Sequence, residues 1–337
     1  MLSYNKLRLA AAFLKGKRLQ HLLGSALDYR RSLLSKKVVM KHYPPAVMIE
    51  PTNICNLKCP LCPSGNGTLK RERGMMDLNG FLKIVDQIHH HTAMLILWNQ
   101  GEPYLNPDFN KMVAYAAQKK LYTMTSTNAS LALDHDAIVR SGLDRIIISM
   151  DGISEETYNS YRINGDFTLV LDNMQKLIDA KKRLNSKTPF IVWQYIVMRQ
   201  NEHEIPAVRR KARELGVDSL EFKTVQIYKP EDLIFLPTDH KLSRYSAEGQ
   251  DFELATQLLN RCRRLWTQPV INWDGELSIC CYDKDVIFKI GNVYDLDFYD
   301  LWTSDKMNKI RARILQDRQS IEICRNCGEG IIQKLKL

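Results

Sequence analysis

The alternation of two kinds of segment between residues 46 and 225 constrains the fold most. Six short segments are apolar or rich in β-branched residues, and five stretches with apolar residues at helical spacing separate them. The predicted strands are 46–50, 94–98, 122–127, 145–150, 190–198 and 219–225, and the predicted helices are 77–91, 107–119, 134–141, 166–184 and 202–215. Strands that alternate with helices pair in parallel through right-handed crossovers. The sequence therefore predicts an α/β fold around a parallel sheet.

Three cysteines, Cys55, Cys59 and Cys62, follow the first predicted strand within one loop. Thiolates at this spacing can bind three irons of a single iron–sulfur cube. No other cysteine lies near them in the sequence, so the fourth iron would stay open to another ligand. A structural metal site is normally closed, and the incomplete set therefore indicates a reactive cluster.

The run Cys-x3-Cys-x2-Cys after a short apolar strand resembles the signature of the radical S-adenosylmethionine (radical SAM) superfamily. Leu61 occupies a position that is usually aromatic in that family. The resemblance implies a partial (β/α)6 barrel over residues 46–235. It also implies that S-adenosylmethionine binds the open iron of a [4Fe-4S] cluster. Reductive cleavage of this cofactor gives a 5′-deoxyadenosyl radical that abstracts a hydrogen atom from the substrate.

Further segments that follow the predicted strands resemble the cofactor-binding motifs of this family. Residues 99–103, Asn-Gln-Gly-Glu-Pro, are similar to its Gly-Gly-Glu-Pro turn, with Gln100 at the first glycine. Because the carboxyl ends of parallel strands meet at one edge, the residues that follow them gather there. The resemblance assigns S-adenosylmethionine binding to Gly101, Glu102, Asn128, Ser149 and Arg162. A solvated surface position is the alternative for Arg162.

A second group of cysteines lies near the C-terminus, at positions 262, 280, 281, 324 and 327. Asp274-Gly275 predicts a tight hairpin just before Cys280. The order of these features resembles the SPASM/twitch domain, which carries auxiliary clusters in many radical SAM enzymes. The resemblance implies a small C-terminal domain over residues 262–330 with a second [4Fe-4S] cluster. Its predicted ligands are Cys262, Cys280, Cys324 and Cys327.

Two residues beside this second group have open roles. Cys281 is not among the four predicted ligands. It is a small buried apolar side chain, a spare ligand or a redox-active thiol. Asp283 is the candidate catalytic residue, because some relatives use an acid there to take a proton when the substrate radical loses an electron. A solvated turn aspartate is its alternative.

The formal net charge of +10 is concentrated at the N-terminus. Residues 1–45 contain ten basic side chains and one acid, and the rest of the chain is close to neutral. Residues 1–42 have apolar positions at helical spacing, which predicts one or two helices. Three interpretations stay open for this basic helical segment: a cap on the barrel, a helix on a membrane surface, or an arm for an acidic partner.

The remaining expectations concern the chain as a whole. No apolar run approaches the roughly 20 residues of a membrane span. We predict a cytoplasmic protein, with peripheral membrane contact through residues 1–42 as one option, and we interpret residues 236–261 as a bridge. In a cytoplasmic protein we interpret the eight cysteines as metal ligands in preference to disulfides.

The predicted function is that of an iron–sulfur-dependent oxidoreductase. The leading substrate is a small, sugar-like metabolite that undergoes dehydrogenation, with the auxiliary cluster accepting an electron. Modification or crosslinking of a peptide is the second candidate within the enzyme class. An electron donor such as flavodoxin or ferredoxin is expected. A zinc-knuckle adaptor for nucleic acid is the alternative from another class, although no nucleic-acid partner is expected.

Overall fold

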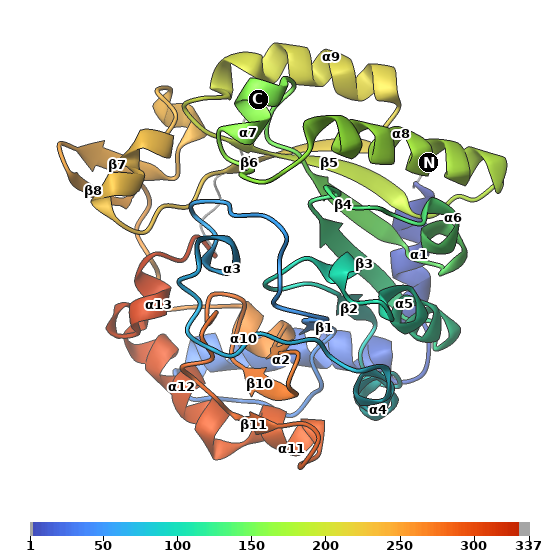
Figure 1. Cartoon of the computed structure of the whole chain (residues 1–337). Coiled ribbons are helices and arrows are strands. Elements are labelled where there is room, and N and C mark those ends of the chain that lie inside the picture. Colours follow the sequence, from blue (N-terminus) through green and yellow to red (C-terminus); the bar gives the residue numbers. More distant parts are fainter. Residues whose placement is uncertain (1–2, 330–337) are drawn as a thin grey trace.

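Strand β1 (Ala46–Ile49) lies inside a nine-stranded sheet in the computed structural model, which describes residues 3–329. Five strands follow β1 in order and in parallel, as Figure 1 shows. They are β2 (Met94–Ile96), β3 (Tyr122–Thr127), β4 (Arg145–Ser149), β5 (Phe190–Val197) and β6 (Ser219–Thr224). Strand β6 ends the sheet, which stays open there among the described residues. The predicted α/β class and the open parallel barrel are confirmed.

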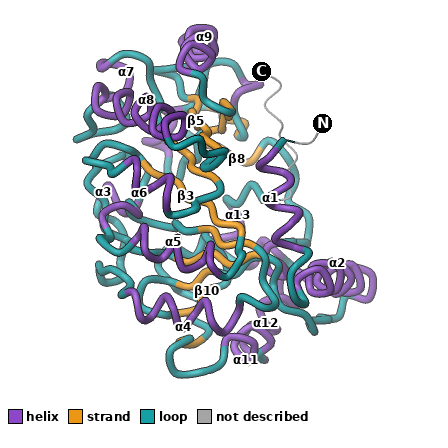
Figure 2. The backbone as a smooth tube through the Cα atoms, turned by 90° about the vertical axis from the view of Figure 1, so that its right-hand side faces the viewer, coloured by secondary structure: helices purple, strands orange, loops and turns teal. Residues whose placement is uncertain are grey.

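Helices connect these strands and cover one face of the sheet (Figures 1 and 2). They are α4 (Leu78–Ile88), α5 (Phe109–Gln118), α6 (His135–Arg140), α7 (Glu155–Asn159), α8 (Phe167–Arg183) and α9 (Ile205–Leu215). Val47 and Ile49 of β1 belong to the main apolar core, whereas Met48 packs in a small cluster of its own. This alternation follows from the two-residue period of a strand. Successive residues of β1 therefore pack on opposite faces of the sheet, one against the helices and one in the smaller cluster.

The C-terminal cysteine region continues the same sheet. Strand β9 (Val270–Ile271) pairs in parallel with β1, and β10 (Glu276–Ser278) and β11 (Gly291–Asn292) follow in antiparallel order. The predicted hairpin is confirmed, with Gly275 at a φ of 83° at its turn. The pairing of β9 with β1 was not predicted. Helices α10 (Arg264–Thr267), α11 (Phe298–Thr303), α12 (Asp305–Gln316) and α13 (Glu322–Arg325) complete this region.

The N-terminal segment forms two helices, α1 (Tyr4–Phe13) and α2 (Arg18–Ser35), as the apolar spacing predicts. Helix α1 packs against the start of β3, where Ala12 contacts the cluster around Tyr122. Helix α2 packs against α10, and the Trp266 indole donates to the Val39 carbonyl at 3.1 Å. Residues 1–2, and position 330 of the predicted C-terminal domain, lie outside the described residues. Among the described helices, none has the length and apolar character required to cross a bilayer.

Residues 236–261 contain more structure than the predicted bridge. Strands β7 (Tyr245–Glu248) and β8 (Asp251–Leu254) form a separate antiparallel hairpin, with Gly249 at a φ of 61° in the turn. The hairpin shows as the projecting pair at the left of Figure 1. Its strands carry Ser, Glu and Asp at exposed positions, so the apolar run that would have signalled strands is missing.

Candidate active site

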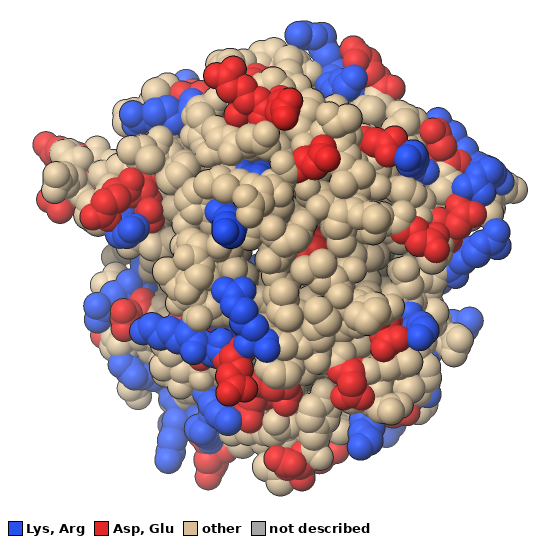
Figure 3. Space-filling view, viewed as in Figure 1, with Lys and Arg blue, Asp and Glu red and all other residues tan. Residues whose placement is uncertain are grey.

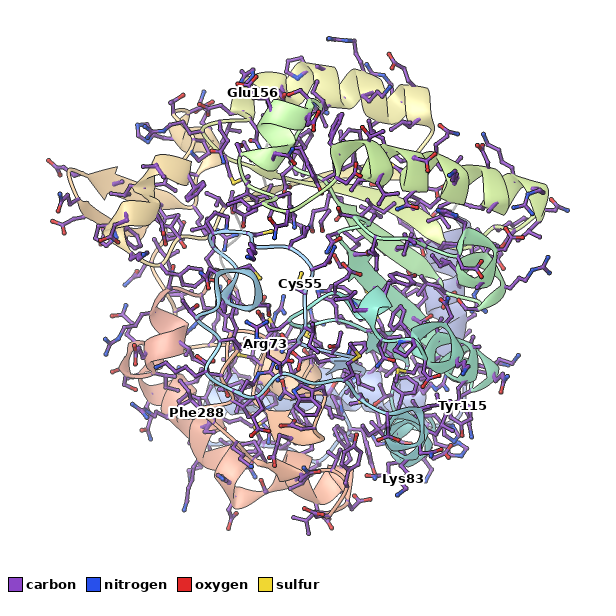
Figure 4. The ribbon with its side chains drawn as sticks, viewed as in Figure 1. Cys55, Arg73, Lys83, Tyr115, Glu156 and Phe288 are labelled. Carbon is purple, nitrogen blue, oxygen red and sulfur yellow. The ribbon has the colours of Figure 1, made fainter. Side chains whose placement is uncertain are left out.

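The three-cysteine loop follows β1 and lies on the face turned toward the viewer in Figure 4, where Cys55 is near the centre and Arg73 lies on the same segment. Contacts with the ends of later strands hold the loop. Glu102 N donates to the Ile54 carbonyl at 2.8 Å, and the Asn56 side chain donates to the Ser130 carbonyl at 2.7 Å. The loop is thus fixed by the segments that follow β2 and β3.

Cys55, Cys59 and Cys62 belong to one apolar cluster with Leu57 and Leu61. Burial raises the pKa of the Cys55 thiol to about 12, with smaller contributions from Glu102 and the other two cysteines. Burial also raises the pKa of Cys59. Cluster ligands are thiolates, so cluster assembly must supply the free energy of their deprotonation.

The turn after β2 lies directly against the cysteine loop. Gly101 has a φ of 77°, and a Cβ atom there would lie 2.6 Å from the Thr52 carbonyl oxygen, so only glycine fits. Both oxygens of Glu102 accept backbone N–H groups, from Tyr104 at 3.2 Å and from Asn128 at 2.7 Å. Burial raises the pKa of Glu102 to about 7, while the bond from Asn128 acts in the other direction.

Asn128 and Ser149 lie at the ends of β3 and β4, as predicted. The Asn128 amide donates to the Asn56 side chain at 2.9 Å and lies 3.8 Å from Cys55 Sγ. The Ser149 hydroxyl lies 3.3 Å from that of Ser126 on the neighbouring strand. Asn128 therefore contacts the cysteine loop, whereas Ser126 and Ser149 contact each other at the ends of β3 and β4.

Arg162 forms a buried ion pair beside the same loop. Its Nε and Nη2 atoms lie 2.7 Å and 2.6 Å from Asp151 Oδ2, and the Asp151 side chain is fully buried. The third nitrogen, Nη1, lies 3.9 Å from Cys59 Sγ. Burial raises the pKa of Asp151, and Arg162 opposes that shift. A positive charge thus stands next to one of the candidate cluster ligands.

The four candidate ligands of the second cluster line one cavity. Cys262, Cys280, Cys324 and Cys327 reach it from separate parts of the C-terminal region. Arg318 lies in its wall and donates to the Cys327 carbonyl at 3.1 Å and to the Arg261 carbonyl at 3.1 Å. Burial raises the pKa of Cys262 to about 11 and that of Cys324 to about 12. Sequence reasoning missed Arg318, because its partners are backbone groups.

Cys281 does not line this cavity. Its Sγ accepts a hydrogen bond from Arg264 Nη1 at 3.1 Å, and the residue packs against Met48, Ile96 and Val270 on the inner face of the sheet. The two cysteines lie beyond β10, where the Asp283 N–H donates to the Cys280 carbonyl at 3.1 Å and closes a turn, and their side chains separate there. The geometry favours a half-buried packing side chain over a spare ligand.

Asp283 is fully buried, and its two carboxylate oxygens accept the backbone N–H groups of Ile287 at 2.7 Å and Phe288 at 3.0 Å. Burial raises its pKa, and these two bonds lower it. An aspartate engaged in this way stabilises a turn. The arrangement favours a structural role for Asp283 over the predicted role of proton acceptor.

A network that the sequence did not reveal joins the two cysteine regions. Glu50 at the end of β1 forms a two-bond ion pair with Arg71, whose Nε donates to the Lys284 carbonyl at 2.7 Å. One residue earlier, Lys70 N donates to Asp285 Oδ1 at 2.7 Å. Residues 70–71, after the three-cysteine loop, are therefore hydrogen-bonded to residues 284–285, after Cys281.

A cleft of about 680 Å³ opens between these regions. One wall is the cysteine loop and the segment after it, and the other is formed by residues after β6 together with Asp285. Its lining is Pro60, Leu61, Pro63, Asn66, Thr68, Tyr228, Lys229, Glu231, Asp232 and Asp285. On the face seen in Figure 3, lysines and arginines are interspersed with acidic side chains. The cleft thus offers apolar contacts together with groups of both charges.

The donor sets suit clusters better than a single ion. Among residues 3–329, no group of three or more His, Cys, Asp and Glu side chains is arranged to hold one metal ion. In a cubane cluster, each thiolate binds a different iron, so its ligands need not converge on one point. Three sulfurs in one loop and four around one cavity fit that requirement.

Two family models match the chain. The radical SAM superfamily matches residues 49–212, and an iron–sulfur cluster-binding domain named SPASM matches residues 262–328. Together they cover both cysteine groups.

Several curated proteins are similar in sequence. The tungsten-containing aldehyde ferredoxin oxidoreductase cofactor-modifying protein of Pyrococcus furiosus is 25% identical over 302 residues, which cover 78% of this chain and 82% of that protein. The PqqA peptide cyclase of Granulibacter bethesdensis is 26% identical over 190 residues, 55% of this chain and 48% of the relative. That of Gluconobacter oxydans is 29% identical over 188 residues, covering 55% and 50%. The chain therefore matches about half the length of these cyclases.

Solved structures share the fold. BtrN in complex with AdoMet and 2-DOIA superposes with a TM-score of 0.55 at 16% identity, covering 88% of this chain and 98% of BtrN. Streptococcus suis SuiB bound to S-adenosylmethionine gives a TM-score of 0.63 at 15% identity, covering 90% and 76%. From the two cysteine regions, the shared fold and the two family models, it follows that the chain belongs to the radical SAM superfamily, carries a C-terminal SPASM iron–sulfur domain, and uses S-adenosylmethionine and [4Fe-4S] clusters as cofactors.

Proposed function

We propose that this enzyme oxidatively modifies a peptide. The observation that carries the proposal is the cleft between the three-cysteine loop and the loop that contains Asp285. A cleft of this size can accept a segment of extended chain. Two prolines and Leu61 border it on the side of the cysteine loop, and Tyr228 borders it on the other. The names of the PqqA peptide cyclases support a peptide rather than the predicted sugar-like metabolite.

The cofactors, when bound, supply one-electron reduction and a carbon radical that takes a hydrogen atom from the substrate. Cys55, Cys59 and Cys62 are the proposed ligands of the first cluster. Gly101 lets the turn after β2 approach the loop closely, and the Glu102 carboxylate is positioned to accept a bond from an ammonium group. Asn128 orients the loop through Asn56. Arg162 stands beside Cys59 as the partner for an anionic group.

Cys262, Cys280, Cys324 and Cys327 would hold the second cluster, which would supply an acceptor for one electron. The net change would be the loss of two hydrogens from the peptide: one would pass as an atom to the carbon radical, and the other would leave as a proton to solvent water, with its electron taken by that cluster. The new bond forms within the peptide. Four protein ligands close this cluster, which suits electron transfer rather than substrate binding.

Transfer of deuterium tests the substrate class. The reconstituted enzyme receives S-adenosylmethionine, dithionite and a perdeuterated peptide mixture, made by proteolysis of a perdeuterated protein extract. A parallel reaction contains perdeuterated glucose and glycerol. We expect 5′-deoxyadenosine that carries one deuterium from the peptide mixture alone. The variant with Cys55, Cys59 and Cys62 all changed to Ala is the control and should form none. Deuterium from the polyols alone would show that the substrate is a small hydroxylated metabolite.

A further inference from the structure

Helix α2 buries six residues, most of them polar, and exposes four of its six leucines. The buried residues of this helix are Arg18, His21, Gly24, Ser25, Asp28 and Ser32. The opposite side carries Leu19, Leu23, Leu27 and Leu34, which are 41%, 59%, 50% and 76% exposed. A surface helix of a soluble protein ordinarily shows the reverse arrangement. The leucine side therefore indicates an apolar partner outside the chain.

Hydrogen bonds fix this orientation of α2. The buried Arg18 guanidinium donates to the carbonyl oxygens of Lys120 at 2.6 Å and Lys119 at 2.8 Å. The buried Asp28 carboxylate lies 2.8 Å from His42 Nδ1 and also accepts from Lys41 N at 2.8 Å. A rotation that buried the leucines would expose these bonds to water or break them. The leucine side thus has no alternative place in the core.

Helix α1 and the residue that follows it carry two further exposed leucines. Leu7 is 50% exposed and Leu14, at the end of the helix, is 70% exposed. Figure 2 shows α1 and α2 along one side of the molecule, and α3 (Pro63–Asn66), next to the three-cysteine loop, on the other side. We name the surface formed by Leu7, Leu14, Leu19, Leu23, Leu27 and Leu34 the leucine surface.

Basic side chains accompany the leucine surface. Eight lysines and arginines of this segment are exposed, and none forms an ion pair with an acidic residue that the structure describes: Lys6, Lys15, Lys17, Arg30, Arg31, Lys36, Lys37 and Lys41. The single acid among residues 1–45 is Asp28, which is buried. Exposed leucines among unopposed cations match the interface of an anionic bilayer, where acyl chains lie beneath negative headgroups.

We propose that α1 and α2 dock this enzyme onto an anionic membrane surface. The helices lie in the plane of the interface: the leucines enter the acyl boundary and the cations meet the headgroups. No part of either helix spans the bilayer. Because α1 and α2 lie on the side of the molecule opposite α3 in Figure 2, docking through them leaves the segment beside the three-cysteine loop facing away from the membrane. The proposal is independent of the substrate class.

Vesicle flotation tests the proposal with the full reconstituted chain. The probes are vesicles of phosphatidylcholine alone and vesicles that also contain phosphatidylglycerol. We expect flotation with the second kind, and its loss as NaCl rises from about 0.1 M to about 1 M, because screening shortens from about 10 Å to about 3 Å. The triple variant L23Q/L27Q/L34Q should bind roughly 100-fold more weakly. The charge variant R30Q/R31Q/K36Q/K37Q should bind roughly 1,000-fold more weakly.

A matched variant and a second readout keep the result specific. L259Q/I287Q/L296Q removes three exposed apolar side chains elsewhere and should bind as the wild type does. A tryptophan in the variant Leu34→Trp should shift its fluorescence to the blue with anionic vesicles, whereas one in Leu296→Trp should not. Equal cluster content in all variants shows that each folds. Failure of the wild type to float with anionic vesicles overturns the proposal, and leaves a protein as the partner of the leucine surface.

Discussion

Glu50 and Arg71 form a two-bond ion pair in which Nη1 and Nη2 lie 2.7 Å and 2.5 Å from the two carboxylate oxygens. Glu50 is fully buried, and the Arg71 side chain is 10% exposed. The pair joins the end of β1 to the segment after the first cysteines, and through the Lys284 carbonyl to the C-terminal region. The contact adds to the pairing of β9 with β1 in joining the two cysteine regions.

Arg71→Ala should destabilise the protein by about 3–5 kcal/mol, because it leaves the Glu50 carboxylate buried without a counter-charge. The measurement is the free energy of unfolding in guanidinium chloride. Arg183→Ala is the matched control, since it breaks the Arg183–Asp136 pair, in which both side chains are exposed. The control should lose less than about 1 kcal/mol. Equal losses of unfolding free energy in the two variants would mean that the buried pair stabilises the protein no more than the exposed pair does.

Cys280→Ser and Cys281→Ser should differ although the residues are adjacent. Cys280 lines the cavity with the other three candidate ligands, whereas Cys281 points to Met48 and Arg264. We expect Cys280→Ser to lose the spectrum of the second cluster and Cys281→Ser to keep it. Electron paramagnetic resonance of the reduced proteins separates the two outcomes. Loss of the second cluster in Cys281→Ser alone would reassign the ligand.

Glu102 should make stability fall as the pH rises from about 4.5 to about 7. Burial raises its pKa to about 7, so over that range the unfolded chain loses this proton while the folded chain keeps it. Its contribution is therefore fully present below pH 4.5 and is lost above pH 7, a change of up to about 3 kcal/mol. Unfolding of the cluster-free protein measured across this range should show a smaller slope for Glu102→Gln. Glu253→Gln, at an exposed position, should keep the wild-type slope.

Arg162→Gln should weaken binding of S-adenosylmethionine about 10-fold or more, because one charge-assisted hydrogen bond is worth about 1.5–3 kcal/mol. The affinity is compared at equal iron content, since Arg162→Gln also leaves the buried Asp151 carboxylate without its counter-charge. Cofactor-induced change in the cluster signal measures the affinity. Arg145→Gln is the control. Arg145 begins β4, at the end of the strand away from Ser149, and the change breaks its ion pair with Glu221. Unchanged affinity in Arg162→Gln would remove this residue from the cofactor site.

The local pattern of the sequence was sufficient for β1 to β6, because apolar runs and helical spacing are properties of neighbouring residues. It was also sufficient for the hairpin at Gly275, where the Asp-Gly pair sets the turn. The pairing of β9 with β1 was not predictable in this way, since two residues carry no period and the partner lies far away in the sequence. Glu50 and Arg71 are a similar case. Each looks like an ordinary surface charge until the fold brings them together.

The same limit applies to the candidate site. The spacing of the cysteines indicates which residues are able to bind a cluster. The hydrogen bonds to Glu102 and Asp283 come from backbone N–H groups, which every sequence has, so the sequence does not predict them. For Asp283, those bonds point to a turn rather than to catalysis. The leucines of α2 were visible as helical spacing, but the burial of its polar side was not.

Iron and acid-labile sulfide counts on anaerobically reconstituted protein test the central claim most directly. We expect about eight irons and about eight sulfides per chain. Both counts should fall to about four when Cys55, Cys59 and Cys62 are changed to Ala, and also when Cys280, Cys324 and Cys327 are changed to Ala. A wild-type count of about four irons that only the first set removes would contradict the second cluster and its role as electron acceptor. Zinc without labile sulfide would contradict the radical mechanism altogether.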